Sequence, residues 1–199
     1  PPVDESGPFG YLAEKASTNL ALQSEDFTTT WNINGGTAVA DVGVAPDGTT
    51  TMDRLDVSTT AGYHIAYPNN TVTASTTYTY SVYMKDDGAG FGGLSVGTNN
   101  KFFAVVVDLS SGLVTHTGVG ATSGTIVATG CEDAGDGIYR VWISGNIGVT
   151  TGFCVIFASD AAVPTLTVDG LPSYLGVAGE DILIWGAQLE QSSYPTSYI

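Results

Sequence analysis

The sequence predicts an all-β protein, a two-sheet antiparallel β-sandwich of the jelly-roll kind. Apolar residues alternate with polar ones or form short runs, and no long window repeats them at the roughly 3.6-residue period of a helix. Clusters of Gly, Asp, Asn, Ser and Pro interrupt these runs, as tight turns require. Only 13% of the residues are charged, so the polar surface must be rich in Thr, which favours strands, and Gly, which favours turns.

The first half of the chain contains one strand whose two faces can be assigned. In "YTYSVYMK" (78–85) the alternation predicts a core face of Tyr78, Tyr80, Val82 and Met84. The other face then holds Thr79, Ser81, Tyr83 and Lys85. Shorter strands are expected at "TNLALQ" (18–23) and "YHIAY" (63–67). The longer stretch 11–27 has some helical character, but we expect it to run as an extended arm into the first strand.

The second half of the chain supplies most of the remaining strands. They are expected at "KFFAVVVDL" (101–109), "GTIVATG" (124–130), "IYRVWISG" (138–145), "GFCVIFAS" (152–159) and "DILIWGAQL" (181–189). Together these make roughly nine or ten strands at a spacing typical of a sandwich or barrel. Because 18–23 and 181–189 are both nearly continuous apolar runs, we expect them to lie side by side as central strands.

The chain is expected to form one domain with a short extension. Residues 1–16 are predicted to be an arm or linker from a longer polypeptide, and residues 17–199 the jelly-roll domain. The first ten residues lack the basic start and apolar run of a signal peptide, and no stretch has the length of a membrane span.

The charge balance is strongly negative, with 5 Lys and Arg against 20 Asp and Glu and a net charge of −15. This composition argues against nucleic acid or an anionic membrane as a partner, since both are bound by basic patches. It is expected to keep the protein soluble. It also fits either a protein adapted to high salt, where carboxylate repulsion is screened, or an ordinary acidic secreted protein.

Few residues of the types used in catalysis are present. The two histidines, His64 and His116, lie near no Gly-x-Ser-x-Gly elbow, and with Cys131 and Cys154 they do not form a zinc-ligand pattern. Whether the two cysteines pair is left open. A carboxylate pair for glycoside hydrolysis could be built from distant acids, so the sequence alone leaves a hydrolase or lyase domain as a minor alternative.

Several segments resemble the jelly-roll domains of phage tail and head fibres, which are similar to carbohydrate-binding modules. The matching segments are "TNLALQSEDFTTTW", "APDGTTTMDRL", "TYTYSVYMK", "VVVDLSSG", "DGIYRVWISG" and "WGAQLEQSSYPTSYI". The resemblance implies a non-catalytic, receptor-binding module of a virion fibre that contacts host-surface glycan. Fibres of this kind are commonly trimeric, so a homo-oligomer is expected. Two departures are a long insertion over residues 158–180, which could form a specificity loop, and Ile138 in place of an aromatic residue.

Sugar binding needs an exposed aromatic ring for the C–H face of the sugar and polar side chains for its hydroxyls. In the strand 138–145, Trp142 and Arg140 share the face opposite Tyr139, Val141 and Ile143, which makes them the first candidate pair. Tyr83 and Lys85 are the second pair, and Trp31 is a further candidate. The alternatives are a Trp142 covered by a loop, an Arg140 paired with an acid, a Tyr83 packed on the Lys85 stem and a Trp31 that plugs the end of the sandwich.

The resemblance also implies a structural Ca²⁺ near the paired terminal strands. Glu25 and Asp26 follow the first expected strand, and Glu180 and Asp181 begin the last. If these strands are antiparallel neighbours, the four carboxylates meet at one end of the sandwich, where they would supply the oxygen ligands that Ca²⁺ prefers. The alternative is a solvated acidic edge. A second reading of the whole chain is a structural fibre or capsid decoration domain whose outer sheet packs against sister subunits.

Overall fold

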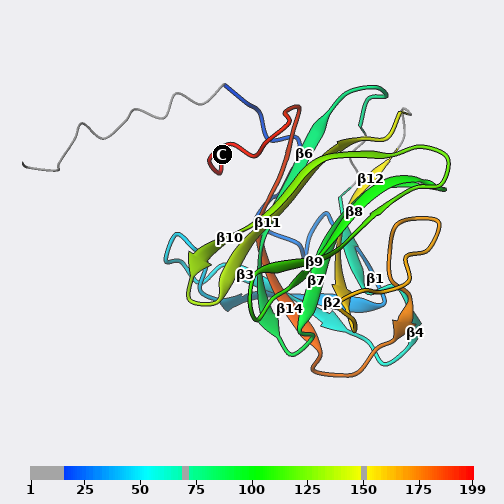
Figure 1. The fold of residues 1–199 in the computed structure, drawn as a ribbon. Helices are drawn as coiled ribbons and strands as arrows, with labels where there is room; N and C mark the ends of the chain where they lie inside the picture. Colours follow the sequence, from blue (N-terminus) through cyan, green and yellow to red (C-terminus); the bar gives the residue numbers. More distant parts are fainter. Residues whose placement is uncertain (1–15, 69–71, 149–151) are drawn as a thin grey trace, which may run out of the picture.

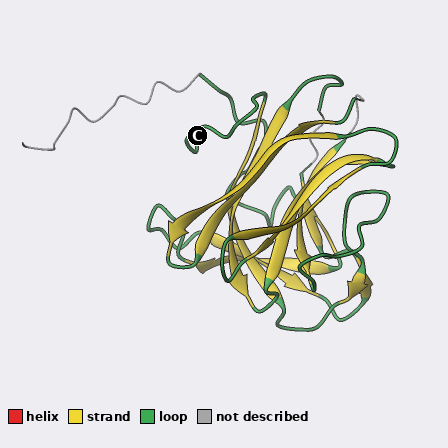
Figure 2. Ribbon diagram, in the orientation of Figure 1, coloured by secondary structure: helices red, strands yellow, loops and turns green. Residues whose placement is uncertain are grey.

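The computed structural model describes residues 16–68, 72–148 and 152–199, and the expected arm over residues 1–16 lies almost wholly outside them. Figure 2 shows strands and loops throughout this part of the chain, and the described residues include no helix that could cross a membrane. The strands form two antiparallel sheets of six, so the predicted all-β sandwich is confirmed. The chain passes between the sheets repeatedly, as in a jelly roll (Figure 1).

The first sheet, called sheet A, contains in spatial order β1 (Asn32–Asn34), β5 (Ile65–Tyr67), β12 (Phe153–Ser159), β7 (Phe91–Thr98), β8 (Lys101–Asp108) and β9 (Leu113–Val119). Sheet B contains β10 (Thr125–Gly135), β11 (Ile138–Asn146), β6 (Tyr78–Asp87), β14 (Asp181–Glu190), β3 (Met52–Val57) and β2 (Gly36–Gly43). A small ribbon pairs β4 (Ala61–Gly62) with β13 (Tyr174–Leu175). The fourteen strands in the described parts of the chain exceed the number expected, because several are too short to show a hydrophobic pattern.

The core lies between the two sheets and follows the predicted alternation. The inward residues of β6, including Tyr80, Val82 and Met84, are fully buried against apolar side chains of β7 and β8. The outward residues Thr79 and Ser81 are also fully buried, which the alternation does not predict. Further structure must therefore cover the outer face of sheet B.

The N-terminal run 18–23 does lie beside the last strand, but it forms no strand of its own. Leu20 N donates to the Leu189 carbonyl over 2.8 Å, and Ala187 N donates to the Ser24 carbonyl over 2.9 Å. The Asn19 side chain binds the backbone of Ala187 and Leu189 at 3.0 Å each. The strands paired with β14 are β6 and β3. The expected central position is therefore confirmed for 181–189, whereas 18–23 is not a central strand.

Strand β14 is buried along its whole length because it is covered on both faces. Ile182, Ile184 and Leu189 point into the sandwich, whereas Leu183 and Trp185 belong to a separate apolar cluster on the outer face. A bulge at Gly186, whose φ is +62°, adds one residue after Trp185, so the inward positions change from Ile182 and Ile184 to Ala187 and Leu189. Residues 19–25 lie along β14, and Ser24 and Glu25 there contact Tyr198 of the C-terminal segment 191–199 (Figure 1).

Candidate functional site

The surface expected at Trp142 and Arg140 has the predicted orientation, but it is largely covered. Val141 and Ile143 are fully buried in the core, so Arg140 and Trp142 do point outward on β11. Arg140 is nonetheless only 8% exposed, with Nη2 donating to Ser81 Oγ over 3.2 Å and its guanidinium 5.6 Å from the centre of the Tyr83 ring. Its Nε has no partner among the described residues, and none of their carboxylates pairs with it. Arg140 is therefore not available to a ligand at the surface.

Trp142 lies across the edge strand rather than presenting a free face. It is paired with Gly130 of β10, and a side chain at Gly130 would overlap the indole, with a Cβ 2.4 Å from Cε2. The indole Nε1 donates to Glu132 Oε1 over 3.2 Å, and the residue is half-buried. One face of the ring is thus occupied by the backbone of β10.

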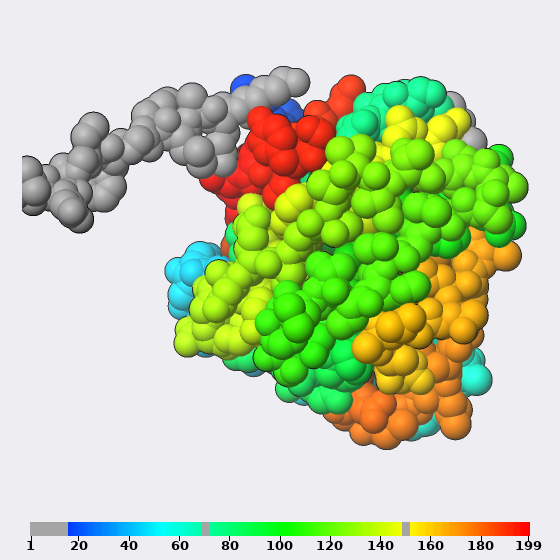
Figure 3. All heavy atoms as spheres, viewed as in Figure 1, coloured from blue at the N-terminus to red at the C-terminus, as the bar shows by residue number. Residues whose placement is uncertain are grey.

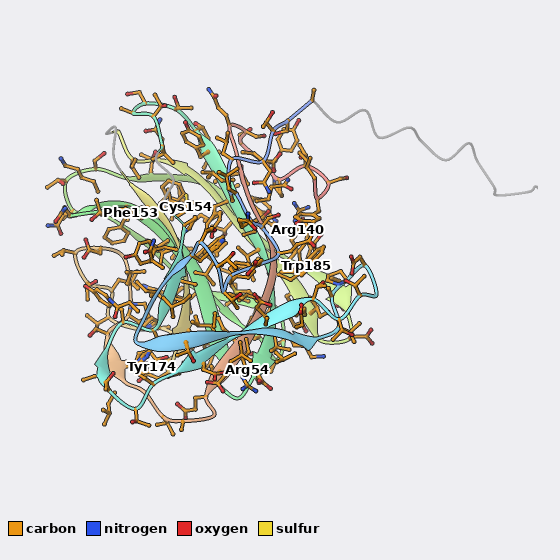
Figure 4. All side chains as sticks on the ribbon, turned by 180° about the vertical axis from the view of Figure 1, so that it is seen from behind. Arg54, Arg140, Phe153, Cys154, Tyr174 and Trp185 are labelled. Atoms are coloured by element: carbon orange, nitrogen blue, oxygen red, sulfur yellow. The ribbon has the colours of Figure 1, made fainter. Side chains whose placement is uncertain are left out.

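Tyr83 and Lys85 also fail to form an open pair. The Tyr83 ring packs against Trp185 at 5.4 Å and Tyr198 at 6.3 Å between ring centres, so it is part of the covered cluster. Lys85 is half-buried near Gly137. Figure 4 shows Arg140 and Trp185 together on one side of the molecule, under the C-terminal segment.

Trp31 is a core residue and not a stacking platform. It is 7% exposed, packs on Phe27 with 4.5 Å between ring centres, and donates from Nε1 to the Gln23 carbonyl over 3.1 Å. The expectation that it contacts a ligand is therefore corrected. Its ring instead belongs to the main core cluster.

The four acids expected to hold Ca²⁺ are not brought together. The N-terminal segment leaves β14 at Ser24, so Glu25 and Asp26 turn toward Asp53 and Asp41, with which they line a hollow. Asp181 lies at the far end of β14, where Oδ1 accepts the Val57 N–H over 2.7 Å and Oδ2 lies 3.8 Å from Arg54 Nε. No group of three or more His, Cys, Asp or Glu suited to a metal occurs in residues 16–68, 72–148 and 152–199. This geometry gives the calcium expectation no support.

Glu25, Asp26 and the neighbouring Asp53 instead accept hydrogen bonds from backbone N–H groups and side-chain hydroxyls. Asp26 accepts hydrogen bonds from the Thr28 N–H and hydroxyl and from Thr29 Oγ1, and the Thr28 hydroxyl bond is the main cause of its lowered pKa. Glu25 Oε1 accepts the Tyr198 hydroxyl over 2.8 Å. Asp53 accepts the Phe27 N–H over 2.8 Å and the Asp41 N–H over 3.0 Å, and burial raises its pKa.

The two cysteines are free thiols that lie in different sheets, Cys131 in β10 and Cys154 in β12. Burial raises the pKa of Cys131 to about 11, and the nearby Glu132 and Asp133 add to this rise. Burial raises the pKa of Cys154 further still. Neither thiol is therefore a nucleophile at neutral pH.

A groove on the outer face of sheet A has the features that the Trp142 surface lacks. It has a volume of about 200 Å³ and crosses four neighbouring strands, β1, β5, β12 and β7. Its lining combines aromatic, aliphatic and polar side chains: Asn34, Tyr63, Ile65, Tyr67, Gly97, Thr98, Phe153, Val155, Asp169 and Leu171. Phe153 lies on the side of the molecule away from Arg140 and Trp185 (Figure 4).

Three aromatic rings form the walls of this groove. Phe153 is 44% exposed at the start of β12 and meets Tyr67 of β5 edge to face, with 5.7 Å between ring centres. Tyr67 and Tyr63 are half-buried and pack on the cluster of Ile65, Val155 and Leu171. Gly97 of β7 pairs with Phe153 and also lines the groove, and its φ of +131° together with its close packing on Phe102 leaves no room for a side chain there.

Asp169 supplies the charge of the groove and is held in place by its neighbours. Its Oδ1 accepts the Thr98 hydroxyl over 2.9 Å and the Asn99 N–H over 2.8 Å. Among the described residues, its Oδ2 has only a long contact of 3.5 Å from the Tyr63 hydroxyl. A carboxylate oxygen has room for more than one donor, so Oδ2 can accept hydrogen bonds from a ligand.

The loop 160–173 positions Asp169, and it lies within the insertion singled out in the sequence. Thr167 N donates to the Leu171 carbonyl and Gly170 N to the Thr167 carbonyl, closing a tight turn around Asp169. Gly170 has a φ of +72° and lies so close to the sheet that a Cβ would sit 2.3 Å from the Phe102 ring. Asn100 N donates to the Val168 carbonyl, which fixes the loop to the β7–β8 turn. Figure 3 shows this segment (orange) against the green strands of the sandwich.

Sequence reasoning assigned no role to Tyr63, Tyr67, Phe153 or Asp169. The available signals were the alternation of Tyr63, Ile65 and Tyr67 and the long insertion, but nothing in the sequence shows that β5 and β12 are neighbours. A search with protein-family models gives no match to this chain, and a search of curated proteins gives none.

Proposed function

We propose that this chain is a non-catalytic glycan-binding module and that the groove on sheet A is its binding site. The observation that carries the proposal is the exposed Phe153 ring beside Tyr67, with Asp169 and Asn34 in the same groove. An aromatic ring packs against the C–H face of a sugar, and the carboxylate and amide bind its hydroxyls. Following the fibre resemblance, we further propose a virion protein that attaches to host-surface glycan.

The groove chemistry favours binding over hydrolysis. Glycoside hydrolysis commonly uses two carboxyl groups that flank the scissile bond. Among the described residues that line the groove, Asp169 is the single acid, and one of its oxygens is already engaged by Thr98 and Asn99. The groove thus has an acceptor for hydroxyl groups without a second acid opposite it.

Titration calorimetry with a panel of host-type oligosaccharides tests the proposal. We expect Phe153→Ala and Tyr67→Ala each to weaken binding by about tenfold or more, because removal of a stacking ring typically costs a large part of the affinity at such a site. Tyr194→Ala is the matched control, since Tyr194 is an exposed tyrosine in the C-terminal segment and outside the groove. Its affinity should equal that of the unmodified protein.

Trp142→Ala separates the groove from the surface expected at β11. We expect this variant to bind as the unmodified protein does, because one face of the indole is already covered by Gly130. Loss of binding in Trp142→Ala with full binding in Phe153→Ala would refute the groove as the site.

A structural role in assembly is the second candidate, and the exposed edge strands favour it. Strands β9 and β10 are the edges of their sheets, and they expose Leu113, Val119 and Val127. Residues 113–135 cover much of the face shown in Figure 3 (green to yellow-green). Unpaired strand edges can join copies of a chain. Sedimentation should show a closed oligomer, such as a trimer, that Val127→Asp dissociates. A monomer at high concentration would exclude this role.

A further inference from the structure

We propose that the groove selects a neutral glycan, whose contacted sugar donates hydroxyl groups to Asp169 and carries no carboxylate of its own. This inference rests on the proposed function, and it adds the substrate class. It follows from the charges in and around the groove. The aromatic contacts alone do not distinguish a neutral sugar from an acidic one.

Asp169 is the only described lining residue of the groove that carries a charge at neutral pH. Its position is fixed from three sides, by the Thr98 hydroxyl, the Asn99 N–H and the turn Thr167–Leu171. It cannot readily swing away from a ligand, because the same turn lies against the sheet at Gly170. A ligand that enters the groove therefore meets a fixed negative charge with acceptor capacity at Oδ2.

The basic side chains in the described part of the chain do not offset this charge within the groove. Arg54 is engaged by Asp56, Asp87 and Asp181 on sheet B, and Lys85 and Arg140 also belong to sheet B. Lys101 is the nearest candidate, since it pairs with Thr98 across the β7–β8 turn, but it is not among the lining residues. With a net charge of −15, the protein as a whole also repels anionic ligands.

A uronic or sialic acid residue would bring a second carboxylate close to Asp169. Two like charges at contact distance repel each other by an amount that grows as water is excluded, and a lining without a cation provides no compensation. A neutral sugar instead offers adjacent hydroxyls, which are donors that a carboxylate oxygen binds well. The same groove is therefore complementary to a neutral glycan and repulsive to an acidic one.

The test compares neutral oligosaccharides of glucose, galactose or mannose with oligogalacturonates and oligoalginates of equal length, by calorimetry at low ionic strength. We expect the best uronate to bind at least about tenfold more weakly than the best neutral glycan, a difference of about 1.4 kcal/mol. Asp169→Asn should reduce this ratio to below about threefold, because it removes the repelling charge and retains an acceptor.

Two charge variants keep the test informative if Asp169→Asn does not fold. Lys101→Glu should widen the ratio further, because it adds a negative charge at the turn beside the groove. Lys85→Glu makes the same charge change on sheet B and should leave the ratio unaltered.

Three outcomes are distinguishable. Uronates that bind as tightly as neutral glycans, or a ratio that Asp169→Asn and Lys101→Glu leave unchanged, overturn this inference while the groove remains a glycan site. Binding of uronates that Lys101→Gln abolishes also overturns it and assigns Lys101 as their partner. Absence of binding to every glycan overturns the proposed function, and this inference with it.

Discussion

The outer faces of the two sheets differ in what covers them. On sheet B the rings of Trp185, Tyr83 and Tyr198 pack together, and Arg140 lies over Tyr83. On sheet A the loop 160–173 covers part of the face and stops at the groove, where Phe153 remains exposed. The comparison shows that strand alternation places an aromatic ring on the outside of a sandwich, but the covering segments decide whether a ligand can reach it.

The largest expected loss of stability comes from a substitution on the covered outer face of sheet B. Trp185 is 3% exposed, and its Nε1 donates to Thr51 Oγ1 over 3.0 Å. Trp185→Ala should lower the free energy of unfolding by about 3–5 kcal/mol, because it leaves a large cavity. Urea unfolding measures the loss, and Trp185→Phe, which keeps a ring, should cost clearly less. A loss below about 1 kcal/mol would show that the cluster does not hold the C-terminal segment.

The next effect concerns the carboxylate that fastens that segment. Glu190 is fully buried and accepts hydrogen bonds from the Thr196 N–H over 3.1 Å and the Thr196 hydroxyl over 2.5 Å. Glu190→Ala should cost about 1.5–3 kcal/mol of stability, as for other hydrogen bonds to a charged group. Hydrogen exchange at residues 194–199 should become faster in this variant, whereas the amides of Phe153–Ser159 should keep their protection. Equal loosening of both regions would contradict the assignment of Glu190 to the C-terminal segment.

The third effect is a dependence of stability on pH that originates on the covered side. Burial raises the pKa of Asp53 and Asp181. As the pH falls from 7, these two carboxylates therefore take up protons in the folded protein before they do in the unfolded protein. The free energy of unfolding rises as a result. Burial opposes the lowering of the Glu190 pKa, but hydrogen bonds from Thr196, Gln188 and Ser17 outweigh it. The stabilisation from Glu190 is therefore present above its ordinary pKa and is lost below it.

The melting temperature should accordingly pass through a maximum near about pH 5 and fall below about pH 4, where the carboxylates with lowered pKa values become protonated. Glu190→Gln should flatten the acid side of this profile. A melting temperature that decreases steadily from pH 7 to pH 5 would contradict the raised pKa values of Asp53 and Asp181.

The smallest expected effect on stability comes from the open side. Phe153→Ala should change the free energy of unfolding by less than about 1 kcal/mol, because the ring is already substantially exposed. A small change in stability together with a large loss of glycan affinity in Phe153→Ala would show that Phe153 serves recognition and not packing. A loss as large as that of Trp185→Ala would place Phe153 among the structural aromatics instead.

The fold could be predicted because its signal is local. The alternation in 78–85 correctly identifies Tyr80, Val82 and Met84 as core, and the turn residues correctly separate the main strands. The same pattern gives Trp142 and Arg140 their outward direction. It could not show that Tyr198 and the segment around it cover the neighbouring rings, since that contact joins residues more than a hundred positions apart.

The candidate site could not be predicted because it is assembled from distant pieces. Tyr67 and Phe153 meet only because β5 and β12 are neighbours in sheet A, and Asp169 arrives on a loop fixed by Thr98 and Asn99. The length of the 158–180 insertion indicates the loop that carries Asp169. It does not indicate which strands this loop packs against.

The position of β14 has a consequence for how the protein reaches its folded state. Sheet B is completed only when residues 181–190 enter between β3 and β6, whose own residues are made roughly a hundred positions earlier. Pairings of such large sequence separation give a high contact order and slow folding, of the order of milliseconds to seconds. During synthesis, β3 and β6 therefore lack the strand that joins them until β14 has left the ribosome, and a chain truncated before Asp181 should aggregate.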